Sequence, residues 1–340
     1  MQVETTFMMR AAGWICGLAL ALSLLLPLAA TAEPISVTTR EISEFRIGRA
    51  EPTFGRFTFV GGLELVGNHR DFGGFSAFRF LDKGRRFLGV SDTGFWFSGE
   101  VERDAASGHP VGIRDFTMEA IPGPEGQRTS KKALVDAEGL ALWKGEAVVS
   151  FEREHRVTRY SLPKGSPPRP LGNVPFLIPR HELRLNRGLE TILAAPATSV
   201  FGDALLVVSE MSLNPAGDLF AAVLFGPRKG IFYVKRRDNF DVTDGAFLPN
   251  GDILLLERRF SYASGVAMRL RSLAAASIKA DATVDGEILL QADMGYQIDN
   301  MEGLDVWQAP DGSTRVSIIS DDNQSFLQRN LYLEFIYADD

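Results

Sequence analysis

The sequence contains a single cysteine, Cys16, which lies in an apolar N-terminal segment and not in the body of the chain. The body therefore has no thiol for a disulfide bond, a soft metal site or nucleophilic catalysis. It also lacks a Walker loop, a dinucleotide-binding glycine fingerprint, a His-Glu-x-x-His pair and a Gly-x-Ser-x-Gly elbow. The sequence therefore lacks the usual signatures of nucleotide-binding proteins, zinc peptidases and α/β-type serine hydrolases.

Basic residues are fewer than acidic ones, with 36 Lys and Arg against 43 Asp and Glu and a net charge of −7. This balance argues against nucleic acid or anionic lipid as a main partner. The histidines are scattered without the spacing of metal ligands. Only His155, within a Glu-Arg-Glu-His-Arg segment at the end of an expected strand, is kept as a candidate general acid or base.

The first 32 residues have the pattern of a signal peptide. Arg10 precedes an apolar run over residues 11–30, and Ala30-Thr31-Ala32 places small residues before Glu33, as at a signal-peptidase site. We expect cleavage there and a periplasmic or secreted protein with no stable membrane insertion. The alternative is an uncleaved anchor, because about 20 apolar residues can span a bilayer.

The mature chain, residues 33–340, is expected to form a single domain. Met8 and Met9 are alternative translation starts, which the sequence does not distinguish from Met1.

A degenerate repeat runs through this body. Each copy begins with a small or acidic residue, glycine and an apolar strand, and continues through a turn into a second apolar strand that ends in Ser, Asp or Glu. The period is about 50 to 60 residues, which is typical of propeller blades. The equivalent positions at the start of the first strand are Ser76, Glu138, Glu190, Asp244 and Glu302.

Five copies are visible, and the length leaves room for a sixth. We therefore predict an all-β, six-bladed β-propeller in which N-terminal strands and the strand near Leu331 to Phe335 combine to close the ring. The alternative is a large β-sandwich or two smaller β domains.

The repeat places two polar positions per blade at one rim, because the start of one strand and the end of its antiparallel partner share an edge. The second-strand positions are Asp92, Glu152, Glu210, Glu257, Asp321 and Asp322. Like charges crowded together raise one another's pKa values or require cations, and Ca²⁺ prefers six to eight oxygen ligands. We therefore predict a calcium site assembled from Asp92, Glu138, Glu190, Asp244, Glu302, Asp321 and Asp322.

Arginines are interleaved with these acids, and an arginine beside a carboxylate-bound metal is suited to an anionic ester. The candidates for substrate binding are Arg153, Arg187, Arg258 and Arg259, and the candidates for catalysis are Glu138, Glu302 and His155. The alternative is structural, since repeated Glu-Gly pairs can accept backbone N–H groups from the next blade and hold the ring in register.

Several segments of the repeat carry a recognisable pattern: Phe72-Gly73-Gly74-Phe75-Ser76, Asp136-Ala137-Glu138-Gly139-Leu140, Asn186-Arg187-Gly188-Leu189-Glu190, Leu256-Glu257-Arg258-Arg259-Phe260 and Ser320-Asp321-Asp322-Asn323-Gln324. In these segments the chain resembles the phytase-like family described by "esterase-like activity of phytase". The resemblance implies an exported propeller related in shape to calcium-dependent phytases and active on an anionic phosphoester or ester. A propeller that binds a ligand or envelope partner without catalysis is the other function we consider, so enzymatic activity stays open.

The signal peptide gives a direct prediction. Mass spectrometry of the protein recovered from the host envelope should show an N-terminus at or near Glu33. An intact leader on a membrane-bound product would contradict the prediction of export and release.

Overall fold

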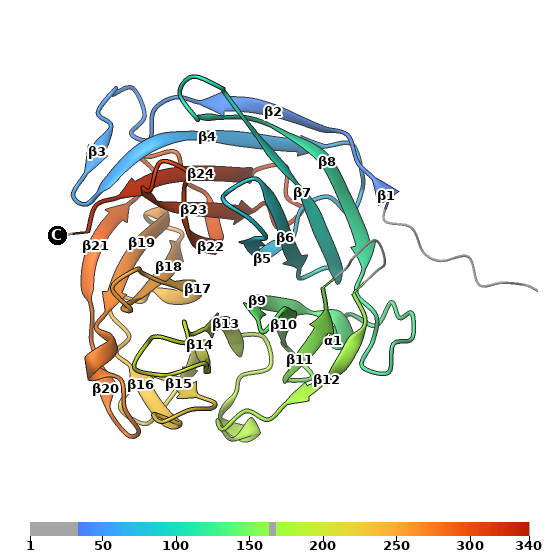
Figure 1. Ribbon diagram of the computed structural model, residues 1–340, viewed down its shortest axis with the longest axis vertical. Helices are drawn as coiled ribbons and strands as arrows, with labels where there is room; N and C mark the ends of the chain where they lie inside the picture. Colours follow the sequence, from blue (N-terminus) through green and yellow to red (C-terminus); the bar gives the residue numbers. More distant parts are fainter. Residues whose placement is uncertain (1–32, 163–167, 340) are drawn as a thin grey trace, which may run out of the picture. The chain divides into compact units, whose positions relative to one another are not determined.

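The computed structural model describes residues 33–162 and 168–339, which form five β-sheets arranged around one axis (Figure 1). The expected signal peptide lies outside the described residues. Within them the helices are short: α1 (Lys132–Val135) and the 3-10 helices η1 (Arg180–Glu182) and η2 (Ala275–Ser277). None of these helices has the length and apolarity needed to cross a membrane.

Each of the five sheets forms one blade. The strands of each blade are named in their order across the sheet, from the outer edge of the ring to the inner edge. Blade 1 contains β1 (Glu33–Pro34), β8 (Pro110–Ala120), β7 (Phe95–Arg103), β6 (Arg86–Ser91) and β5 (Phe75–Phe80). Blade 2 contains β12 (Pro170–Val174), β11 (Arg156–Ser161), β10 (Glu146–Phe151) and β9 (Ala137–Trp143). Blade 3 contains β20 (Thr283–Val284), β16 (Gly230–Val234), β15 (Leu219–Val223), β14 (Leu205–Leu213) and β13 (Leu189–Ala194).

Blade 4 contains β21 (Glu287–Ala292), β19 (Gly265–Leu273), β18 (Ile253–Ser261) and β17 (Asp241–Phe247). Blade 5 contains β2 (Val37–Ile42), β4 (Phe57–Gly67), β24 (Asn330–Tyr337), β23 (Thr314–Asp321) and β22 (Asn300–Gln308), with β3 (Thr53–Phe54) paired to β4. Pairing between these strands is antiparallel, except that β16 and β20 are parallel.

The inner strands form a closed ring. β5 contacts β9 and β22, β13 contacts β9 and β17, and β17 contacts β22. The predicted all-β propeller, with the first strand of each repeat innermost, is therefore confirmed.

The described residues form five blades and not the six that we predicted. β4 pairs along β24, from Leu65 opposite Asn330 to Phe57 opposite Tyr337, so the terminal strands do meet as expected. They extend the sheet of β22 and β23, however, and do not make a separate blade. The chain length suggested six blades because the terminal strands were expected to form a blade of their own. Blade 5 instead combines strands from both ends of the chain with β22 and β23 in one sheet.

Apolar side chains fill the spaces between neighbouring blades. One cluster joins blades 1 and 2 through residues such as Val90 and Val149, and another joins blades 5 and 1 through Phe78 and Tyr332. Both faces of each central strand are covered in this way, which explains near-continuous apolar runs such as 253–256 of β18.

A buried ion pair braces the ring near its axis. Arg79 of β5 donates to both carboxylate oxygens of Asp244 on β17, at 2.7 and 2.8 Å, and also to the carbonyl oxygens of Leu304 and Gly245. Blades 1, 4 and 5 are thereby linked by one guanidinium group. Asp244 also accepts a hydrogen bond from the Leu304 N–H at 2.8 Å, so the buried carboxylate has a backbone donor in addition to Arg79.

Breaking this pair should be costly, because the remaining carboxylate would be buried without its partner. We expect Arg79→Met to lower the free energy of unfolding by about 3–5 kcal/mol in urea titrations. The double variant Arg79→Met/Asp244→Asn should lose less, since no buried charge remains. Arg86→Met, which removes an exposed arginine that pairs with Asp82, is the control. Equal stability of the Arg79 and Arg86 variants would show that the brace contributes nothing.

Candidate active site at the propeller mouth

Each inner strand carries a β-bulge at the same point. In blade 1, Phe75 pairs with Ser91 and Ala77 with Val90, so Ser76 stands outside the ladder. A bulge inserts one residue without a partner and re-aims its side chain. The bulge residues of the five blades are Ser76, Glu138, Glu190, Thr243 and Glu302.

The neighbouring strand of each blade contributes a second polar position. The residue before each bulge pairs with a residue of the neighbouring strand, and the second polar position directly follows that partner. In the five blades these positions are Asp92, Glu152, Glu210, Arg258 and Asp321. With the bulge residues other than Thr243, they line one cavity of about 180 Å³, together with Asn186, Arg187 and Asn323. Seven carboxylates and two arginines of the described chain thus face a single space.

Blade 4 departs from the predicted site. We aligned Asp244-Gly245 with Glu302-Gly303, but the register makes Thr243 the equivalent of Glu302 and Arg258 the equivalent of Asp321. A shift of one residue turns a side chain to the other face of a strand. Asp244 therefore lies in the brace with Arg79, away from the cavity.

Glu257 is displaced from the rim for the same reason. It is buried among Arg269 and Arg271 of β19 and forms ion pairs with both.

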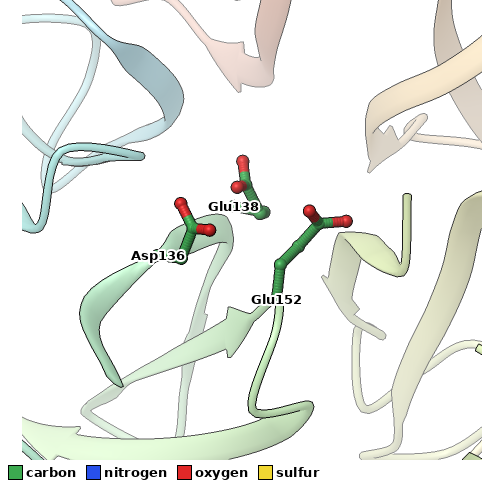
Figure 2. A group of neighbouring side chains, drawn as sticks. All are labelled: Asp136, Glu138 and Glu152. Atoms are coloured by element: carbon green, nitrogen blue, oxygen red, sulfur yellow. The ribbon is translucent and has the colours of Figure 1, made fainter. Parts of the chain in front are cut away.

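Carboxylates in the cavity, with Asp136 at its edge, form two overlapping groups that could hold a metal ion. Asp136, Glu138 and Glu152 each place one oxygen within 4.8 Å of the others, and so do Glu152, Glu190 and Glu210. Figure 2 shows the first group, with Asp136 and Glu138 at the start of β9 and Glu152 just after β10. Glu152 belongs to both groups and also accepts the Gly188 N–H.

Burial and mutual repulsion make these carboxylates hard to ionise. Burial, and then the neighbouring carboxylates, raise the pKa of Glu138 and of Glu190 well above the usual value. Burial raises the pKa of Glu152 to about 7 and that of Glu302 to about 8. Burial, followed by the charge of Asp92, raises the pKa of Asp321 to about 7. A cation is the natural partner of such a cluster.

Arg258 supplies part of the positive charge. Its Nε lies 2.9 Å from an oxygen of Glu302, and its Nη2 lies 3.3 Å from an oxygen of Glu210. Blade 4 thus contributes a cation where the other blades contribute acids. Arg187, whose side chain is half exposed, also lines the cavity and lies 3.1 Å from Asp241.

Sequence reasoning missed Lys132, on α1. Its Nζ lies 2.7 Å from Asp92 and 3.4 Å from Asp136, so it neutralises part of the cavity edge. No repeat or motif marked this lysine, because α1 lies in the connection between blades 1 and 2.

The glycines of the Phe-Gly-Gly-Phe-Ser motif also serve this edge. Gly73 and Gly74 have φ of 116° and 65°, and a Cβ on either would collide with Asp322 or Asp92 respectively. Only glycine lets the chain pass between these two carboxylates.

Four other predicted site residues lie outside the set that lines the cavity. Arg153 pairs with Asp136 at its edge. Arg259 lies over the Phe240 ring and donates to the Asp238 carbonyl oxygen. Asp322 accepts Asn330 Nδ2 at 2.8 Å. His155 is buried against Gly188, where burial and then the charge of Arg180 lower its pKa.

The donor set fits a hard divalent cation. All the converging ligand atoms are carboxylate oxygens, and they outnumber the cations that face them, which is the environment Ca²⁺ prefers. Thiolate and imidazole ligands, which select softer metals, are absent from the described residues that line the cavity.

The raised pKa values make a prediction for the protein freed of metal by chelator. Because the folded state holds protons that the unfolded state releases near pH 4.5, the free energy of unfolding should fall between about pH 5 and pH 8. Glu302→Gln should flatten this decline in thermal melts, whereas Glu287→Gln, at an exposed position on β21, should not. An unchanged slope in the Glu302 variant would contradict the prediction.

Solved structures that match this chain share little sequence with it. The endo-arabinase from Bacteroides thetaiotaomicron matches with 13% identity, 80% coverage of this chain, 96% of that chain and a TM-score of 0.49. The PQQ-bound aldose sugar dehydrogenase from Streptomyces coelicolor matches with 13% identity, 89% and 100% coverage and a TM-score of 0.39. Likenesses at this level carry no argument about activity.

A search of curated proteins finds no match. The model of the family described as "Phytase-like: Esterase-like activity of phytase" matches residues 70–324, which include every residue that lines the acidic cavity. The resemblance noted in the sequence is thereby confirmed, and the chain belongs to the phytase-like family.

Proposed function

We propose that this protein is an exported, calcium-dependent hydrolase of a small anionic phosphoester or ester. The observation that carries the proposal is the cavity at the propeller mouth, where two carboxylate groups share Glu152. Family membership supports an esterase-like activity, and the oxygen-only donor set supports a hard divalent cation.

The carboxylates divide into ligands and a proton carrier in this proposal. The cation would be held by Glu152, either together with Glu190 and Glu210 or together with Asp136 and Glu138. When bound, a divalent cation polarises an ester or phosphoryl oxygen and lowers the pKa of a bound water. Glu302 lines the same cavity, and burial raises its pKa to about 8, a value suited to exchanging a proton near neutral pH.

Two arginines give the cavity its preference for an anion. Arg187 is half exposed and lines the cavity, so its guanidinium group can turn toward a phosphoryl or carboxylate oxygen of the substrate. Arg258 is held by Glu302 and Glu210, and it keeps Glu302 oriented toward the cavity. Lys132 adds a third positive charge at the edge.

The shared carboxylate gives the most direct test. Glu152→Gln keeps the side-chain size but removes the charge common to both carboxylate groups. We expect it to abolish stabilisation by calcium in thermal melts and to lower hydrolysis of p-nitrophenyl phosphate, or of a p-nitrophenyl ester, about tenfold or more, which is about 1.4 kcal/mol of transition-state stabilisation. Glu138→Gln should have a smaller effect, because it belongs to one group only.

Glu287→Gln is the matched control, because it makes the same change at an exposed position of blade 4. If Glu152→Gln keeps the calcium response and full turnover, the rim acids hold the blades in register and the site assignment is wrong. If the wild type shows no turnover on any ester but still binds calcium, a non-catalytic binding propeller becomes the better description.

A further inference from the structure

A second cavity lies beside the acidic one. It has a volume of about 450 Å³ and is formed by the end of β4, the segment that leads to β5 and the loop between β23 and β24. The two cavities share a wall, because Asp321 and Asn323 line the acidic cavity whereas Asp322 and Gln324 line the second one. The second cavity therefore directly adjoins the mouth.

The shared wall has a defined shape. Asn323 and Gln324 have φ of 47° and 51°, so two successive residues adopt the left-handed conformation. Asp322 fixes this turn by accepting the Gln324 N–H at 2.9 Å and the Asn330 side chain at 2.8 Å. With this turn, Asn323 lines the first cavity and Gln324 lines the second.

The charges around the second cavity are matched, unlike those of the first. Arg70 lies 3.4 Å from Asp71, and Glu64 pairs with Arg40. Arg329 donates to the Gln297 side chain and the Ile298 carbonyl oxygen and lies 3.6 Å from Asp299. Two acids, Glu64 and Asp322, and two arginines, Arg70 and Arg329, line the cavity. Because these charges balance, the cavity favours an uncharged polar ligand over an ion.

Groups that can bind such a ligand remain available. The side-chain amide of Gln324 makes no hydrogen bond within the described residues, and the hydroxyl of Ser325 only accepts one, from Leu327 N–H. The ring of Phe326 is 96% exposed at the edge of the cavity. An aromatic face with an amide and a hydroxyl beside it matches a sugar, whose C–H face is apolar and whose hydroxyls donate and accept.

We propose that this second cavity is an accessory subsite for a neutral sugar unit of the substrate, with Phe326 as the stacking surface and Gln324 and Ser325 as its polar contacts. As a statement about the substrate it rests on the proposed function. The binding itself needs neither metal nor turnover, so it can be tested separately.

Saturation-transfer NMR on the mature protein in chelator, with methyl glucoside, methyl galactoside, maltose and N-acetylglucosamine as probes, provides the test. At least one sugar should receive saturation, and cyclohexanol, which has a similar ring but one hydroxyl, should receive much less. Phe326→Ala and Gln324→Ala should each lower the affinity for the sugar by about fivefold or more. Both residues are exposed, so the fold should persist, as unchanged thermal melts would verify.

Tyr262→Ala is the matched control, because Tyr262 is as exposed as Phe326 but does not line the cavity. Glu152→Gln should bind the sugar normally, which separates this inference from the metal-dependent activity. The inference is overturned if none of the four sugars binds, if the Phe326 and Gln324 variants bind like the wild type, or if cyclohexanol binds as well as the sugars.

Discussion

Seven carboxylates share one small cavity at the mouth of the ring. β-Bulges of the inner strands bring Glu138, Glu190 and Glu302 there, and the ends of the neighbouring strands bring the other four. An inner strand with regular pleating would turn alternate side chains into the spaces between blades, where the apolar clusters lie. The bulge releases one residue per blade from that alternation and directs it to the rim. The raised pKa values of Glu138, Glu190 and Glu302 follow from this placement, because burial and like charge act together.

The five blades are alike in backbone register but differ in what they contribute. Blades 2, 3 and 5 each supply two acids, blade 1 supplies Asp92 with a serine, and blade 4 supplies Arg258 and no acid. This asymmetry gives the cavity an acidic side and a basic side, which a ring of identical blades cannot have. A repeat that served only to hold the blades in register would have no need of such a difference.

The brace between Arg79 and Asp244 complements the mouth. It lies one position further along the inner strands than the bulges, where Asp244 is the equivalent of Ala77, Gly139, Thr191 and Gly303. Small side chains there leave room for the guanidinium group that crosses from blade 1 to blade 4. One layer of the ring is thus neutralised internally, whereas the layer above it has an excess of negative charge that an external cation can offset.

The sequence by itself determined the all-β propeller, the innermost position of the first strand in each repeat and most of the acids at the mouth, because a period of about 50 to 60 residues and the end points of apolar strands are local features. Only the tertiary structure decided the number of blades, since strands from both ends of the chain share one sheet. It also decided the residues of blade 4, because the dipeptide Asp244-Gly245 resembles Glu302-Gly303 but stands one residue further along its strand relative to the bulge. Lys132 and the second cavity were likewise beyond the sequence, because each depends on loops that meet in space and not on the repeat.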